Sequence, residues 1–188
     1  MKNIKPTKRR SAQAGITMVE TLMASAILVV VSLGMIGLIV NSIATNNRNK
    51  TDSTQTMLAE SIIEHVNSTL IGQSSSLLSD CAGTSFTIDT IPGGANLTAS
   101  GAGIDYLENI ASDATKAAYH MDYTVNTPCA STGALQGTYD VRWNVQLVGG
   151  STLPTKTYML TVGAKLKNHG EGNRFFSLPV TLRAMAGN

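Results

Sequence analysis

The most apolar stretch of the chain runs from Leu22 to Val40, contains no charged residue and reads LMASAILVVVSLGMIGLIV. A helix that crosses the hydrocarbon core of a bilayer needs about 20 predominantly apolar residues. These 19 residues therefore predict a membrane-spanning helix. Extending the stretch back to Ile16 adds a single ionised side chain, Glu20, so the expected span covers residues 16–40.

Charge is distributed unevenly around this span. Residues 1–15 contain five Lys and Arg residues and no acid, so they carry +5. Residues 16–188 contain nine Lys and Arg residues and twelve Asp and Glu residues, so they carry −3. Because an excess of Lys and Arg marks the cytoplasmic side of a membrane segment, we expect a cytoplasmic N-terminus and an exported body. The acidic body has no basic stripe to neutralise phosphates, so no nucleic-acid partner is expected. The basic head comprises Lys2, Lys5, Lys8, Arg9 and Arg10.

The position of the apolar run argues against an ordinary secretory signal. Such a signal is cleaved after its apolar run, behind small residues, and the run itself has roughly 7 to 15 residues. The run here is longer, and Ser42 and Ala44 offer only a weak cleavage site behind it. We therefore expect the apolar segment to remain in the mature protein.

The residues around Gly15 read KRRSAQAGITMVETLMASAIL. They resemble the class III signal of type IV prepilins and type II secretion pseudopilins, with a basic leader, Gly15, an apolar Ile16 and Glu20 at the fifth mature position. The resemblance implies that prepilin peptidase cleaves between Gly15 and Ile16 on the cytoplasmic face and methylates the new amine of Ile16. Residues 1–15 would then be a leader peptide that is removed.

The chemistry of these residues supports the same spacing independently of the resemblance to prepilins. Glycine has no side chain, so a peptidase can approach the backbone closely. Cleavage leaves an ammonium one turn before Glu20, and a carboxylate in a first turn is favoured by the helix dipole. In a bundle of apolar helices either charge alone would cost several kcal/mol, so pairing with a neighbour's amine would select subunit register. The alternative is a solvated Glu20 with only an intrachain partner.

Two features of the apolar segment bear on the type of subunit. Its small residues permit close approach of neighbouring helices, and they are Ala24, Ser25, Ser32, Gly34 and Gly37. Major pilins often carry a helix-breaking proline in this stretch, and this chain has none there. The later stretch MLAESIIEHV also resembles minor pilins of the PilV type, so a minor pilin or pseudopilin is favoured over a major pilin.

Helical periodicity continues beyond the membrane segment. Leu58, Ile62, Val66 and Leu70 recur at four-residue steps, with Ile63 alongside,. Gly72 is a plausible stop, so one helix from Ile16 to Ile71, roughly 80 Å long, is expected. Its amphipathic half needs a sheet to cover the apolar stripe, and the proposed division is residues 16–72 for the helix and 73–188 for the globular domain.

Apolar and polar residues alternate in the C-terminal part, which predicts strands. Pro179 lacks an amide hydrogen, so its strand should be an edge or be broken there. Residues 73–118 are predicted as a connection with one short helix, marked by Ile104, Leu107, Ile110 and Ala114. The fold class is therefore α+β, a pilin-like long helix packed on an antiparallel sheet of about four strands. Their markers are MDYTVNT, Tyr139 to Leu147, Tyr158 to Leu166, and Phe176, Leu178, Val180 and Leu182.

The chain has two cysteines, Cys81 and Cys129, and both follow the apolar segment. A lone pair on the exported side of a membrane indicates one disulfide. The alternative is two unpaired buried thiols.

No pattern in the sequence indicates an enzyme. The histidines His65, His120 and His169 are isolated and lack ligand spacing such as H-E-x-x-H,. A P-loop, a nucleophile elbow and a dinucleotide fingerprint are also missing. Calcium ligands without EF-hand spacing are conceivable among four aspartates, but solvated loop acids are the preferred interpretation, so no metal and no cofactor is predicted. These aspartates are Asp89, Asp105, Asp113 and Asp122.

The predicted function is that of a structural subunit in a type IV pilus or type II secretion-like filament. The resemblance implies three partners, namely prepilin peptidase, other pilin or pseudopilin subunits, and an inner-membrane assembly platform. The subunit would cross the inner membrane once before it joins the filament. The alternatives are a major pilin, a filament-displayed adhesin or DNA-uptake subunit, and a membrane-anchored protein that never assembles.

Replacing Gly15 by Val tests the processing site. The added β-branched side chain keeps the peptidase from the backbone, so the Gly15→Val chain should persist as an uncleaved, full-length species. Incubation with inverted membranes followed by mass spectrometry measures this directly. Normal removal of residues 1–15 from the variant would contradict the assignment of the motif.

Overall fold

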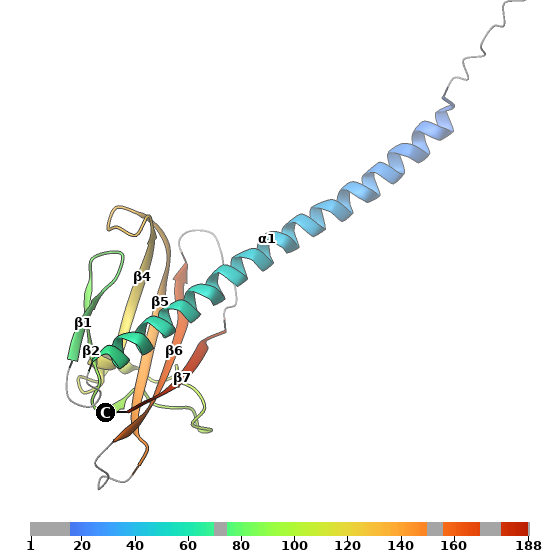
Figure 1. The fold of residues 1–188 in the computed structure, drawn as a ribbon. Coiled ribbons are helices and arrows are strands. Elements are labelled where there is room, and N and C mark those ends of the chain that lie inside the picture. The colour runs from blue at the N-terminus through green and yellow to red at the C-terminus, as the bar shows by residue number, and fades with distance from the viewer. Residues whose placement is uncertain (1–15, 70–74, 150–155, 170–177, 188) are drawn as a thin grey trace, which may run out of the picture. The chain divides into compact units, whose positions relative to one another are not determined.

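The computed structural model describes residues 16–69, 75–149, 156–169 and 178–187. The chain divides into two units, residues 1–45 and residues 46–188. Helix α1 (Met18–Ser68) supplies the described helical part of the first unit and continues into the second (Figure 1). The expected helix is thus present, although it ends at Ser68 rather than Ile71, and Leu70 and Gly72 lie outside the described residues.

An antiparallel sheet forms the centre of the second unit. Its long central strand β5 (Ala134–Leu147) pairs with β6 (Thr157–His169), which pairs with β7 (Val180–Gly187). Along its other edge β5 pairs with β4 (His120–Thr127) and with the two-residue β3 (Gly93–Gly94). The α+β class with a long helix on an antiparallel sheet is therefore confirmed, and the main sheet has five strands rather than four.

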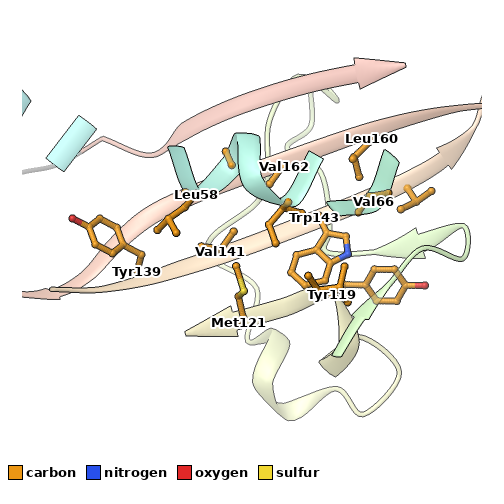
Figure 2. Packing of buried hydrophobic residues seen from close by; sticks show 14 of the residues in the cluster. Leu58, Val66, Tyr119, Met121, Tyr139, Val141, Trp143, Leu160 and Val162 are labelled. Carbon is orange, nitrogen blue, oxygen red and sulfur yellow. The ribbon is translucent and has the colours of Figure 1, made fainter. Parts of the chain in front are cut away.

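The stripe on α1 packs against one face of this sheet. Leu58, Ile62 and Val66 are buried, as their four-residue spacing predicted,. Figure 2 shows Leu58 and Val66 beside the strands that carry Val141 and Trp143. The buried stripe also extends towards the N-terminus through two polar residues, Thr51 and Gln55, which hydropathy alone did not mark.

Alternation along the strands places their apolar residues in this core. The odd-numbered residues from Tyr139 to Val145 and the even-numbered residues from Tyr158 to Ala164 are at most 4% exposed. The predicted faces are therefore correct along most of both strands, whereas Leu147 at the end of β5 is 39% exposed. Trp143 also donates a hydrogen bond from its indole nitrogen to the Asp89 carbonyl, at 3.0 Å.

Strand β7 begins directly after Pro179 and lies at the edge of the strand order. Both observations agree with a residue that has no amide hydrogen to donate. Val180 and Leu182 are partly buried, but Leu178 is 61% exposed and lies before the strand. Phe176 lies outside the described residues.

The segment between α1 and β4 differs from the prediction. It contains a hairpin, β1 (Ser75–Ser79) with β2 (Ser85–Asp89), and two short 3₁₀ helices at Ile110–Ser112 and Ala117–Tyr119. The short helix expected from Ile104 to Ala114 is wrong, because Ile104 forms a bridge with Leu97 and Leu107 is 96% exposed. The residues with helical spacing lie instead in an irregular segment, which contacts the rest of the domain at only a few of them.

That segment covers the second face of the main sheet. Ala95, Ile104 and Ile110 are buried there, and Arg142 donates to the Asp105 and Glu108 carbonyls at 3.3 and 2.9 Å. Burial would raise the pKa of the Asp140 carboxyl, but hydrogen bonds from His120 and Arg142 outweigh it and hold this pKa below its usual value. The second face is thus a polar layer under a loop, with a buried ion pair inside it.

Gly163 tests the packing of this loop on the sheet. A Cβ there would lie 2.7 Å from the Tyr106 hydroxyl and 2.9 Å from Ile104 Cγ1. Gly163→Ala should therefore lower the free energy of unfolding by about 1 to 3 kcal/mol, although alanine suits a strand better than glycine. Urea unfolding followed by fluorescence of Trp143, the sole tryptophan, measures the change.

The matched control is Gly103→Ala, because a Cβ at Gly103 makes only ordinary contact, at 3.5 Å from Thr181 Oγ1. Its stability should stay within about 0.5 kcal/mol of wild type. Equal stability of the two variants would contradict the packing described for Gly163.

Candidate functional site

Helix α1 exposes an extensive apolar surface in the first unit. The part of the chain that the structure describes contains this one helix that is long and apolar enough, by length and composition, to cross a membrane. Its large apolar side chains between Ile16 and Ile43 are 50% to 81% exposed. An apolar surface of this extent marks contact with lipid or protein rather than water. The exposed residues include Met18, Leu22, Ile27, Val30, Leu33, Ile36 and Leu38.

Three hydroxyl groups on this surface are satisfied within the helix. Thr21 donates to the Thr17 carbonyl at 3.1 Å, Ser25 to Leu22 at 2.9 Å and Ser32 to Leu28 at 2.7 Å. A polar group left unpaired in an apolar environment costs roughly 2 kcal/mol or more. These internal bonds remove that cost, so the helix suits an environment without water.

The start of α1 has a cap that the resemblance to the prepilin signal does not predict. The Glu20 amide donates to Thr17 Oγ1 at 3.3 Å, so Thr17 occupies the N-cap position, two residues after the predicted cleavage point. Thr-x-x-Glu is the capping-box pattern, and it offers Glu20 a role within its own helix. Ile16 is 75% exposed, and Gly15 lies outside the described residues.

The glycines of the apolar segment have no packing partner among the described residues. A Cβ built on Gly34 or Gly37 meets no atom within 4 Å. The side chains of Ala24, Ser25 and Ser32 are exposed as well. Within the described chain these small residues therefore leave room for a neighbouring helix, and they are not needed for the fold of the second unit.

A disulfide joins Cys81 to Cys129, so the alternative of two unpaired thiols is wrong. It fastens the turn of the β1–β2 hairpin to the end of β4. Beside it the Cys81 amide donates to the Thr124 carbonyl at 3.2 Å, and the buried Asp80 carboxylate accepts from the amides of Thr84 and Thr124 at 2.7 and 3.2 Å. The bond and these contacts together hold the hairpin on the edge of the sheet.

Three of the four aspartates considered as calcium ligands stabilise turns of their own. Asp89 accepts from the Ile91 amide at 3.0 Å, Asp105 from Leu107 at 2.8 Å and Asp113 from Thr115 at 2.9 Å. Each bond spans two residues, as in an Asx turn. The fourth, Asp122, lies elsewhere, on β4 beside His120.

The fold and this helix define a class, an α+β protein whose single long helix carries an exposed apolar surface of membrane-spanning length. No family model, no curated protein and no solved structure matches the chain. A more specific assignment therefore depends on the residues around the start of α1.

Removing the disulfide should weaken the second unit without abolishing its sheet. The double variant Cys81→Ser with Cys129→Ser should lose about 2 to 4 kcal/mol of unfolding free energy, because the unfolded chain gains the freedom of the opened loop. Urea unfolding monitored by Trp143 fluorescence gives the value. Added reductant should destabilise the wild-type protein by a similar amount and leave the variant unchanged. A wild type insensitive to complete reduction would contradict this account.

Proposed function

We propose that this chain is a structural subunit, a minor pilin or pseudopilin, of a type IV pilus-like or type II secretion-like filament. The observation that carries the proposal is the exposed apolar surface of α1, which begins directly after the Gly15–Ile16 motif and has Glu20 in its first turn. A subunit of this kind uses one helix surface twice, first in the membrane and then against sister subunits.

The energetics of the apolar surface support two alternative environments. Burying a Val, Leu, Ile or Met side chain is worth roughly 1.5 to 3 kcal/mol, and many such side chains are exposed between Ile16 and Ile43. Lipid satisfies this surface before assembly. Neighbouring helices can satisfy it afterwards, because Gly34 and Gly37 leave open space for a second backbone,.

Glu20 is the charged group that must be accommodated when the helix moves from lipid to a bundle of helices. After cleavage the Ile16 ammonium and the Glu20 carboxylate lie at the same end of α1, one turn apart. When the helix leaves lipid headgroups for a bundle of apolar helices, an unpaired charge would be strongly unfavourable. Pairing the carboxylate with the amine of an adjacent subunit removes that penalty and fixes the axial position of the subunit.

Prepilin peptidase and an inner-membrane assembly platform are the partners that this function requires. Before assembly the basic residues 1–15 hold the N-terminus in the cytoplasm, and the α+β domain lies on the periplasmic side. A membrane-anchored protein that never assembles would keep Met1–Gly15 in its mature form, which mass spectrometry of the native protein distinguishes.

Substitutions at Glu20 separate its charge from its place in the capping box. Glu20→Ala should be processed normally but incorporated poorly into filaments. Glu20→Gln keeps a residue that suits the capping box and loses only the charge, so it should show the same assembly defect. Processing is measured by mass spectrometry and incorporation by the amount of subunit in sheared filaments.

Glu60→Ala is the matched control, because Glu60 is an exposed acid on the same helix, far from its start. It should assemble as wild type. Wild-type incorporation of Glu20→Gln would refute the role given to the charge of Glu20 and leave that residue a capping function.

A further inference from the structure

A second cluster of functional groups lies on the face of the main sheet opposite α1. His120 and Asp122 are two residues apart on β4, and Asp140 on β5 is directly opposite Asp122 in the register. His120 Nε2 is 3.4 Å from Asp122 Oδ1 and 3.3 Å from Asp140 Oδ1. Among the described residues, these three side chains form a group whose possible metal-ligand atoms lie within 4.8 Å of one another.

Two cations hold the carboxylates in place. Arg142 donates to Asp140 from Nε at 2.9 Å and from a terminal nitrogen at 2.8 Å. Lys167 donates to Asp122 Oδ2 at 2.6 Å. The Arg142 guanidinium is itself fixed by the Glu108 carbonyl at 2.9 Å. Both carboxylates are therefore oriented from outside the cluster, as ligand carboxylates in metal sites commonly are.

The His120 nitrogen and two carboxylate oxygens converge on one point, and the hydrogen bond from His120 to Asp140 leaves Asp122 Oδ1 without a partner among the described residues. An unprotonated Nε2 would present its lone pair to two carboxylate oxygens, which is unfavourable. A proton on Nε2 can be shared well with only one of them, and Asp122 Oδ1 is shielded from water and accepts no hydrogen bond from the described residues. A metal ion can contact all three atoms at once.

We propose that His120, Asp122 and Asp140 bind a divalent transition-metal ion of the zinc type. Zinc lies about 2.0 to 2.2 Å from nitrogen and oxygen ligands in tetrahedral sites, so neighbouring ligand atoms are roughly 3.3 to 3.5 Å apart. The two distances from His120 Nε2, 3.3 and 3.4 Å, match the edges of such a tetrahedron. With the two carboxylate oxygens within 4.8 Å of each other, the imidazole and both carboxylates can reach one such ion.

The ligand set also selects the type of ion. Calcium and magnesium prefer oxygen ligands alone, whereas an imidazole with carboxylates suits zinc and its neighbours in the transition series. The side chains of His120 and Asp140 are only 15% and 12% exposed, while that of Asp122 is 37% exposed. Asp122 is thus the most exposed of the three side chains, although its Oδ1 is shielded from water. A water molecule bound together with the ion would supply the fourth ligand.

The test uses the full chain in detergent micelles, purified without a polyhistidine tag and stripped of metal with a chelator. Calorimetric titration with zinc chloride should give one ion per chain. At zinc concentrations 100-fold above Kd, the melting temperature of the second unit, followed by Trp143 fluorescence, should rise by roughly 5 to 10 °C. Calcium and magnesium should produce neither effect.

Two variants locate the ion. His120→Gln and Asp122→Asn each remove one ligand while keeping a polar side chain of similar size, and each should weaken zinc binding at least tenfold. His65→Gln, which changes a histidine near the end of α1, should bind zinc as wild type. Equal affinity of the wild type and both cluster variants, or no binding at millimolar zinc, would overturn the site and leave His120 an N–H donor.

Cobalt keeps the proposal testable if a cluster variant does not fold. Cobalt(II) replaces zinc in tetrahedral sites and then absorbs visible light strongly, whereas the hydrated octahedral ion absorbs weakly. A strong visible spectrum of the wild-type chain that disappears on adding zinc supports the site. A spectrum identical to that of aqueous cobalt overturns it.

Discussion

The contact between one stripe of α1 and one face of the β5–β6 sheet is the interaction on which the second unit depends. Leu58, Ile62 and Val66 supply the helix side, and Val141 and Trp143 lie on the sheet side. An amphipathic helix and a half-apolar sheet each need a partner to bury their apolar surfaces. Because both surfaces are satisfied by this contact, the domain requires nothing from the first part of α1, whose apolar residues stay exposed and available for lipid or for other helices.

The two parts of α1 differ in what their small and polar residues do. In the second unit the stripe includes Thr51 and Gln55, which are buried against the domain. In the first unit the hydroxyls of Ser25 and Ser32 bond to their own helix, and a Cβ on Gly34 would meet no atom of the described residues within 4 Å. The same residue types thus serve tertiary packing in one part and leave a free surface in the other. This difference agrees with the proposal that the helix exchanges lipid for protein while the domain remains folded.

Sequence patterns predicted the elements with strong periodicity and failed where contacts are irregular. The stripe from Leu58 to Val66 and the alternation around Trp143 follow directly from helical and strand geometry, and the single cysteine pair left one disulfide to form. The segment around Ile104 was assigned to a helix because hydrophobic spacing cannot distinguish a helix from a loop that touches the sheet at intervals. Thr17 was recoverable, since Thr-x-x-Glu is a local signal. The association of His120 with Asp140 could not be predicted from local sequence, because it depends on the register between β4 and β5.

Alternation along β5 places apolar side chains on one face of the sheet and charged side chains on the other. Its odd-numbered residues, such as Trp143, face α1, and its even-numbered residues, Asp140 and Arg142, face the opposite side. A buried ion pair seldom adds stability over an apolar core, so stability does not explain why this second face is charged. Arg142 instead holds the covering segment through the Asp105 and Glu108 carbonyls, and it orients the Asp140 carboxylate that the proposed zinc site uses,. The ligands also lie across the sheet from the α1 stripe, so they can change without altering the contact that holds the domain together.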